Sequence, residues 1–301
     1  MGSVGSVGSR RLPEVPVPVR PPHFPYFPYF PYSPYFPGGA GVNDTLDAEE
    51  IARGLGTRWM SRSLEVRAET GSTNDDCVAL ARGGAPAGTV IVADHQTAGR
   101  GRRGRRWQAP PGTAVLLSAV LRPRLPAGTI GRLGIAGALA VVEAVWRTTG
   151  LATATKYPND VLLRERKVAG VLPEAHLAGG AIEWAVLGIG INVQRAAVPP
   201  ELCTQATSLE EHAPPPGRNA LIRALLAALE TRLERAESDP DALAAEWRAC
   251  DVVLGRQVSV AAGTARVEGL ATDVDPDGRL LLRLPDGTEQ PFAPGEVSFT
   301  A

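Results

Sequence analysis

From residue 44 onward, the apolar positions follow the two spacings that distinguish strands from helices. Runs of β-branched and aliphatic residues predict strands at about 63–66, 89–93, 113–121, 161–163, 168–172 and 184–188. Apolar residues three or four positions apart predict helices at about 48–55, 74–82, 128–148, 220–237 and 242–250. Strands and helices mix without strict alternation, so the pattern predicts an α+β fold with a mixed β-sheet flanked by helices.

The last fifty residues have a different pattern. Short β-rich runs are separated by turn signals that contain glycine, such as Asp277-Gly278 and Asp286-Gly287. Such spacing is typical of a small antiparallel β domain. We therefore expect a large domain at residues 44–250 and a small C-terminal β-barrel domain at residues 251–301.

Residues 1–43 follow neither spacing. They hold ten prolines, four of the five tyrosines and four of the six phenylalanines of the chain. Proline at every third position favours an extended path without donors for a ladder, so we expect a disordered tail. No apolar stretch follows Arg10 and Arg11, which argues against a secretory or twin-arginine signal. The sequence leaves open whether the tail docks a partner or whether the true start lies downstream.

Composition limits the classes of function. A formal net charge of -1 argues against a nucleic-acid coat or a membrane-surface protein, and no apolar run suggests a membrane span. The three cysteines, Cys77, Cys203 and Cys250, are sparse and predict small buried side chains in a reduced compartment. The expectation is a cytoplasmic protein that binds neither DNA nor membrane.

The strongest chemical signal is the basic loop GRGRRGRRW at Gly99–Trp107. Glycine allows the backbone to approach a ligand closely, and arginine presents a rigid fork to phosphate or carboxylate. The loop also fits G-x-G-x-x-G, but Pro110 and Pro111 prevent the helix that a dinucleotide fingerprint must open. No Walker-type G-K-S/T follows either. The loop therefore suits a reaction that brings two anions together.

Three further motifs follow the same order as in a known family. They are Gly71-Ser72-Thr73-Asn74, then Lys156-Tyr157-Pro158-Asn159-Asp160 with Lys167-Val168-Ala169-Gly170-Val171-Leu172 and Glu174, and finally Gly188-Ile189-Gly190-Ile191-Asn192-Val193. With the basic loop, they resemble the motifs of biotin–protein ligases over about residues 69–193, and Gly295-Glu296-Val297 resembles the family's C-terminal barrel. Each motif alone is weak, but together they are specific.

The chain departs from the family pattern at three places. Tyr157 stands where the family commonly has tryptophan, and Ala109-Pro110 stands where it commonly has Ser-Pro. Some members carry an N-terminal helix-turn-helix, whereas only some 70 mostly proline-rich residues precede Ser72. The resemblance is therefore to the single-function type that lacks this domain.

The resemblance implies an ATP-dependent ligase. Its substrates are biotin and MgATP, its intermediate is biotinyl-5'-AMP, and its acceptor is a lysine of a biotin carboxyl carrier domain. The implied biotin-binding residues are Ser72, Thr73, Asn74, Gln96, Arg100, Gly101, Arg102, Lys167 and Gly170. The implied ATP-binding residues are Arg102, Arg105, Trp107, Lys156, Asn159, Asp160 and Asn192. Lys167, Arg102 and Arg100 are the implied catalytic residues, and Asp160 is the implied ligand of Mg²⁺.

Several structural alternatives remain open from the residues themselves. Ser72 and Asp75 fit a capping box for the next helix. Lys167 fits the exposed tip of a hairpin whose turn is 164–167, and Gly188 and Gly190 fit β-bulges. The functional alternatives are a lipoate or octanoate–protein ligase, which shares the fold but is expected to have a less basic loop, and a biotin-sensing regulator. The sequence also leaves open a homodimer.

Overall fold

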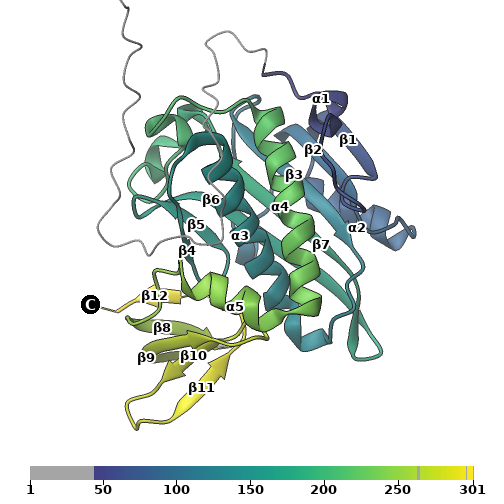
Figure 1. Ribbon diagram of the computed structural model, residues 1–301. Coiled ribbons are helices and arrows are strands. Elements are labelled where there is room, and N and C mark those ends of the chain that lie inside the picture. The colour runs from purple at the N-terminus through teal and green to yellow at the C-terminus, as the bar shows by residue number, and fades with distance from the viewer. Residues whose placement is uncertain (1–43, 263–264, 296, 301) are drawn as a thin grey trace, which may run out of the picture.

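The protein is described by a computed structural model that covers residues 44–262, 265–295 and 297–300, so the predictions for residues 1–43 lie outside the described residues. Seven strands form the first sheet, in the order β1-β2-β3-β7-β6-β5-β4 (Figure 1). Their bounds are β1 Ser63–Thr70, β2 Thr89–Gln96, β3 Ala114–Leu121, β4 Ala154–Lys156, β5 Asp160–Leu163, β6 Arg166–Ala178 and β7 Ala181–Asn192. β1 and β2 pair in parallel and all other neighbours are antiparallel, which confirms the predicted mixed sheet.

The helices cover the two faces of this sheet unequally. They are α1 Ala48–Ala52, α2 Thr73–Arg82, α3 Ile130–Thr149, α4 Arg218–Ser238 and α5 Pro240–Arg248. α3 and α4 lie side by side across one face (Figure 1), and Val115 and Leu117 of β3 belong to the core beneath them. Val120 of β3 belongs instead to a second cluster with Cys77 of α2. Because successive strand residues point to opposite faces, α2 covers the other face and leaves part of it open.

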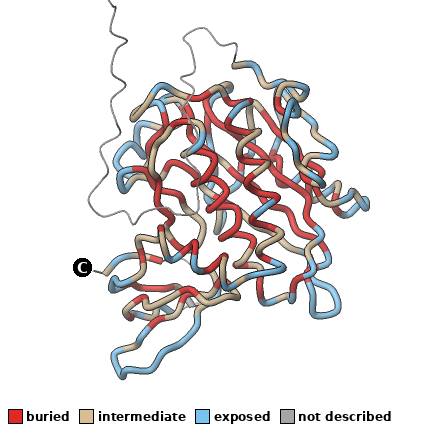
Figure 2. Tube along the Cα trace, in the orientation of Figure 1, coloured by how far each residue is buried: buried red, intermediate tan, exposed pale blue. Residues whose placement is uncertain are grey.

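α3 is the central core helix. A Cβ on Gly137 would lie 2.8 Å from Val171 Cγ1, so glycine lets this helix approach β6 closely. Contrary to the sequence prediction, the stretch Ala127–Thr149 is long and apolar enough to cross a membrane. However, 83% of its most apolar 18-residue part is buried, and Figure 2 colours most of this helix as buried. Its apolar length therefore reflects core packing.

The C-terminal strands form a second sheet. They are β8 Gln257–Ala262, β9 Ala265–Val274, β10 Leu280–Arg283, β11 Glu289–Phe292 and β12 Val297–Phe299, in the order β11-β10-β9-β8-β12 with antiparallel pairing. This small antiparallel unit agrees with the predicted fold class; the predicted boundary between residues 250 and 251 stays a prediction. The Tyr157 hydroxyl donates to the carbonyl oxygen of Gly278 at 3.0 Å, which ties the first sheet to the second.

Two details of the sequence prediction were wrong. Cys203 is exposed rather than buried, although Cys77 and Cys250 are buried as expected. The hairpin turn consists of Arg164 and Glu165, whose φ angles are +48° and +66°. β6 begins at Arg166, so Lys167 is a strand residue and not a turn residue.

Candidate functional site

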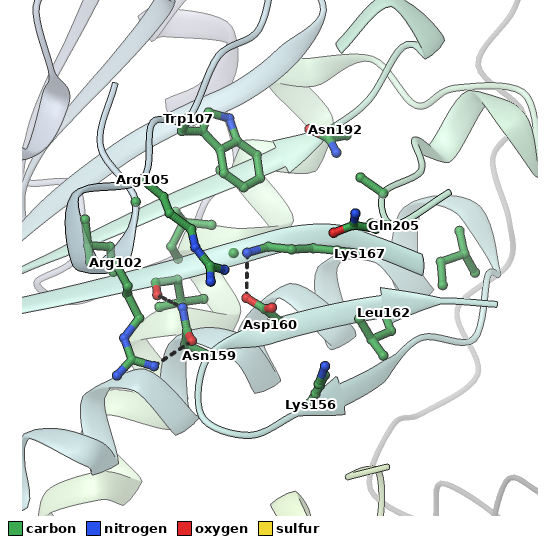
Figure 3. Close-up of a pocket in the computed structure, with 18 of the residues that line it drawn as sticks. Arg102, Arg105, Trp107, Lys156, Asn159, Asp160, Leu162, Lys167, Asn192 and Gln205 are labelled. Atoms are coloured by element: carbon green, nitrogen blue, oxygen red, sulfur yellow. Dashed lines mark hydrogen bonds and ion pairs between the residues drawn. The ribbon is translucent and has the colours of Figure 1, made fainter. Parts of the chain in front are cut away.

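A cavity of about 2350 Å³ lies between α2, the basic loop and strands β3 to β7. It contains every residue predicted for the site. These are Ser72, Thr73, Asn74, Gln96, Arg100, Gly101, Arg102, Arg105, Trp107, Lys156, Asn159, Asp160, Lys167, Gly170 and Asn192. Figure 3 shows Arg102, Arg105 and Trp107 of the loop beside Asn159, Asp160 and Lys167. The fold therefore gathers motifs that are more than one hundred residues apart in the chain.

One end of the cavity is lined by a polar network, which we define as Thr73, Asn74, Gln96 and Ser118. Gln96 Oε1 accepts from the Thr73 backbone N–H at 2.8 Å and lies 3.0 Å from its hydroxyl. Ser118 Oγ donates to Asn74 Oδ1 at 2.6 Å and lies 2.7 Å from Thr73 Oγ1. Thr73, Asn74 and Ser118 are at most 4% exposed. These hydrogen bonds therefore fix the uncharged side chains in place without a ligand.

Ser72 lies beside this network and does not cap α2 with its side chain. It is the N-cap residue by backbone geometry, but its hydroxyl makes no capping hydrogen bond. The side chain is only 2% exposed and belongs to the wall of the cavity. The capping-box alternative is therefore wrong.

Glycines form the floor of the cavity where β6 and β7 pass beneath it. A Cβ on Gly188 would lie 2.0 Å from Asn74 Oδ1, and one on Gly190 would lie 2.6 Å from the Trp107 indole. Gly170 pairs with Gly190 across the sheet, and its Cβ would lie 3.2 Å from the same indole. The strand register is continuous at both β7 glycines, so the bulge alternative is wrong. Glycine is needed here because other side chains lie directly on the strands.

The basic loop is held closed by contacts within the protein. Arg100 makes a bidentate pair with Glu174, at 2.9 and 2.6 Å, and a second ion pair with Asp75 at 2.8 Å. Arg102 donates to Asn159 Oδ1 at 3.0 Å and to the Pro294 carbonyl at 2.8 Å. Protein carboxylates therefore already neutralise Arg100.

The charged end of the cavity contains Lys167 and Asp160. Lys167 Nζ lies 2.6 Å from Asp160 Oδ1, and the two side chains are 33% and 29% exposed. The ammonium is also 5.7 Å from the centre of the Trp107 ring (Figure 3). The backbone N–H of Lys167 donates to the Gln205 carbonyl and its carbonyl accepts from Thr207. A partly exposed ammonium on a fixed backbone can turn from Asp160 toward an incoming anion.

Two other predicted residues are held by different parts of the chain. Asn192 donates through Nδ2 to the Thr207 carbonyl at 3.0 Å, so the segment that pairs with Lys167 also orients Asn192. Lys156 Nζ lies 4.9 Å from the centre of the Phe299 ring in the C-terminal domain. Lys156 therefore extends toward the second sheet, whereas Lys167 contacts Asp160.

Asp251 supports the segment that carries Asn159 and Asp160. Its carboxylate accepts from the backbone N–H groups of Tyr157 at 3.0 Å and Val253 at 2.8 Å. Burial raises the pKa of Asp251 to about 7, although these backbone donors act in the opposite direction. A wall of the cavity therefore contains a carboxyl group that titrates near neutral pH.

A preformed cage for a metal ion is not present among the described residues. No group of three or more His, Cys, Asp or Glu side chains lies close enough together in this part of the chain. Asp160 could therefore offer a metal ion only one carboxylate, and further ligands would have to come from a bound substrate or water. This donor set fits Mg²⁺, which is commonly bound by one or two carboxylates with substrate phosphates and water.

Sequence reasoning missed three residues that organise the site. Ser118 is the only polar residue within β3, AVLLSAVL, which is a usable signal for a functional group in a buried strand. Glu174 was part of a recognised motif but received no role. Asp75 was considered only as part of a helix cap. All three act through contacts with residues 25 to 100 positions away, which the local pattern does not reveal.

Comparison with known proteins agrees with this architecture. The profile of the "Biotin/lipoate A/B protein ligase family" matches residues 70–192, and that of the "Biotin protein ligase C terminal domain" matches residues 253–300. The chain is 41% identical over 236 residues to the biotin--[acetyl-CoA-carboxylase] ligase of Mycobacterium tuberculosis, which covers 76% of this chain and 85% of that one. It is 32% identical to the bifunctional ligase/repressor BirA of Bacillus subtilis, over 82% of this chain and 78% of the relative.

Solved structures show the same arrangement. The biotin protein ligase of Aquifex aeolicus in complex with biotin and ATP is 26% identical, with a TM-score of 0.68 over 79% of this chain and 100% of that one. A mutant of the same ligase in complex with biotin is 27% identical, with a TM-score of 0.68 over 80% of this chain and 99% of that one.

Proposed function

Because the chain belongs to the biotin protein ligase family, we propose that its cavity first forms biotinyl-5'-AMP from biotin and MgATP and then transfers biotin to a lysine of a biotin carboxyl carrier domain. The observation that carries this proposal is the meeting of two environments in one cavity. Buried, uncharged polar side chains lie at one end, Lys167 and Asp160 lie at the other, and the basic loop spans the two. Such a cavity suits a ligand with a neutral polar ring and a reactive carboxylate.

The neutral end is suited to the ureido ring of biotin. Ser72, Thr73, Asn74 and Gln96 offer hydroxyl and amide groups, which can donate to a carbonyl or accept from ring N–H groups. Their positions are set by hydrogen bonds within the network and by the helix start at Ser72. Because uncharged partners suffice for an uncharged ring, no ion has to be buried here.

Lys167 is the residue that we assign to the first chemical step. The biotin carboxylate oxygen attacks the α-phosphorus of ATP, a new P–O bond forms, and pyrophosphate leaves with the electrons of the broken P–O bond. Lys167 Nζ leaves Asp160 and lies between the carboxylate and the α-phosphate, where it stabilises the charge that builds on the phosphate oxygens. Arg100, Gly101 and Arg102 cover biotin, and Arg102 also reaches the phosphates. Gly170 keeps the floor beneath Lys167 open.

We assign the nucleotide to the space between the loop and β5. Trp107 lines this space, and its buried Nε1 has no hydrogen-bond partner among the described residues. Arg105, Lys156, Asn159 and Asn192 line the same space. Asp160 would hold Mg²⁺, and the metal would neutralise phosphate charge when bound.

The second half-reaction joins biotin to the carrier. The uncharged ε-amine of the acceptor lysine attacks the biotinyl carbonyl carbon, a C–N bond forms, AMP leaves, and the amine releases a proton. We propose that the partner is the carrier domain of a biotin-dependent carboxylase, with no role for DNA, and that the reaction takes place in the cytoplasm. A gel-shift measurement on biotin operator DNA tests the regulator alternative.

Pyrophosphate exchange is the direct test. With each acid supplied in turn, ATP–pyrophosphate exchange is expected with biotin and not with lipoate or octanoate. Transfer to a purified carrier domain should then require both biotin and MgATP. Exchange that runs on lipoate and not on biotin would overturn the assignment in favour of a lipoate–protein ligase.

A further inference from the structure

We propose that Glu174 is a positioning residue that latches the basic loop onto the neutral end of the cavity. It connects Arg100 of the loop with Asn74 of α2, so that the polar network and the loop are held as one unit. The expected effect of Glu174 on biotin binding rests on the proposed function. The latch itself requires no ligand.

The geometry of Glu174 supports this role. Its two carboxylate oxygens accept from Arg100 NH1 and NH2 at 2.9 and 2.6 Å, and Oε2 also accepts from Asn74 Nδ2 at 2.6 Å. A bidentate arginine–carboxylate pair fixes orientation as well as distance. One carboxylate therefore joins two elements that lie 26 residues apart in the sequence.

The Asn74 side of the latch is rigid. Asn74 is 4% exposed, its Oδ1 accepts from Ser118 Oγ at 2.6 Å, and Gly188 leaves no space beneath it. Any displacement of Asn74 must therefore disturb β3 or β7. Glu174 transmits this rigidity to Arg100, and through Arg100 to the loop.

Asp75 provides a natural comparison because it pairs with the same guanidinium at 2.8 Å. The Asp75 side chain is 60% exposed and that of Glu174 is 32% exposed. Solvent screens the Asp75 pair more strongly, so this pair should contribute less to holding the loop. We therefore expect the two carboxylates to contribute unequally although both contact Arg100.

The latch links loop closure to the state of Asn74. A ligand that contacts both Asn74 and the closed loop favours the closed loop, and the closed loop favours that ligand by the same factor. Loss of the Glu174 charge should therefore weaken biotin binding and speed release of the adenylate more than it slows adenylation. A purely structural residue would instead lower the melting temperature and leave these ratios unchanged.

The experiment is limited trypsin digestion of the full chain without ligands. Arginines at positions 100, 102, 103, 105 and 106 make the loop cleavable, and mass spectrometry identifies each cut. Glu174→Gln keeps an amide oxygen for Asn74 but removes the charge, so the cutting rate at positions 102–106 should rise about tenfold. Asp75→Asn, the matched control, should raise it about twofold or less.

Two further variants make the result decisive. Glu174→Asp should restore part of the protection. Arg100→Gln removes the partner of Glu174 on the loop. The double variant with Glu174→Gln should be cut no faster than either single variant. If Glu174→Gln and Arg100→Gln are both cut at the wild-type rate, the latch is overturned. Because this digestion requires neither biotin nor ATP, its failure is distinguishable from failure of pyrophosphate exchange.

Discussion

The two ends of the cavity differ in burial and in charge. At the neutral end, Asn74 and Ser118 are 4% and 0% exposed and are joined by a hydrogen bond of 2.6 Å. At the charged end, Lys167 and Asp160 are about one-third exposed and are joined by an ion pair. Burial makes the first set rigid, and partial exposure leaves the second set able to change partners. The difference separates recognition of the acid from the chemistry performed on it.

Desolvation explains why this division is favourable. A lysine and an aspartate buried as deeply as Ser118 would lose hydration energy that their mutual attraction does not restore. A hydroxyl and an amide can be buried at little cost when each is hydrogen-bonded. The cavity therefore keeps charge near solvent and reserves its interior for neutral groups.

The largest effect is expected at the charged end, from Lys167→Gln. This change keeps length and polarity but removes the charge between the two anions. The kcat for adenylation should fall by about two to three orders of magnitude, as for the loss of other preorganised donors. Biotin affinity and transfer from preformed biotinyl-adenylate should fall less. Single-turnover pyrophosphate release measures the first effect and equilibrium biotin binding the second.

Lys156→Gln is the matched control for this variant, because Lys156 contacts Phe299 rather than Asp160. It should lower adenylation less than Lys167→Gln. Adenylation by Lys167→Gln at the wild-type rate would make Lys167 a simple strand lysine and move the catalytic assignment to Lys156.

A smaller effect of a different kind is expected at the neutral end, from Ser118→Ala. The change leaves buried Asn74 Oδ1 without its Ser118 donor, and the Thr73 hydroxyl keeps only Gln96 Oε1. Biotin Kd should rise about tenfold, which matches the cost of an unsatisfied buried polar group. The rise should be the same at low and high ionic strength, because no charge is involved. Strong salt dependence of this loss would contradict the division between the two ends.

A still smaller effect is expected in the loop that joins the two ends, from Arg102→Gly. Arg102 contacts Asn159 and the Pro294 carbonyl, so its loss should loosen the loop over the ligands. Release of biotinyl-adenylate should quicken by about fivefold, and biotin should reach lysines outside the carrier domain. Unchanged adenylate retention in a filter-binding assay would remove this arginine from the mechanism.

The smallest effect is expected from removal of residues 1–43. Asp44, which accepts from the Arg218 guanidinium at 2.9 Å, must be retained. The residues assigned to both ends of the cavity begin at Ser72. Activity and melting temperature should therefore change by less than about twofold and about 2 °C respectively, since a proline-spaced segment has few means to join a core. A soluble but inactive truncated protein would show that the tail has a function.

The sequence predicted most elements because their periodicity is strong. The apolar runs of β3 and α3 were placed within two residues of their observed bounds. The turn was misplaced because Arg164 and Glu165, rather than glycine or asparagine, adopt positive φ angles. The order of the seven strands could not be derived from spacing alone, because pairing depends on contacts between distant segments.

The candidate site was predictable only where a motif was recognisable. Residue types in the basic loop indicate anion chemistry, but Lys167 and Asp160 depend on the family resemblance. Ser118 and Glu174 remained without a role because each acts on a partner at least 44 residues away. Such hydrogen bonds form between segments that only the folded chain brings together, so local sequence patterns do not reveal them.

The glycine floor has a consequence for engineering substrate range. Gly188 and Gly190 have no side chain to shorten, so a substitution at either position can only add atoms. Such a substitution can make the cavity shallower here, but none can make it deeper. An alanine at Gly190 would collide with Trp107 before it contacted any ligand. Variants designed to accept bulkier acids must therefore gain volume at the walls, where Leu116 and Leu172 still carry side chains that can be reduced.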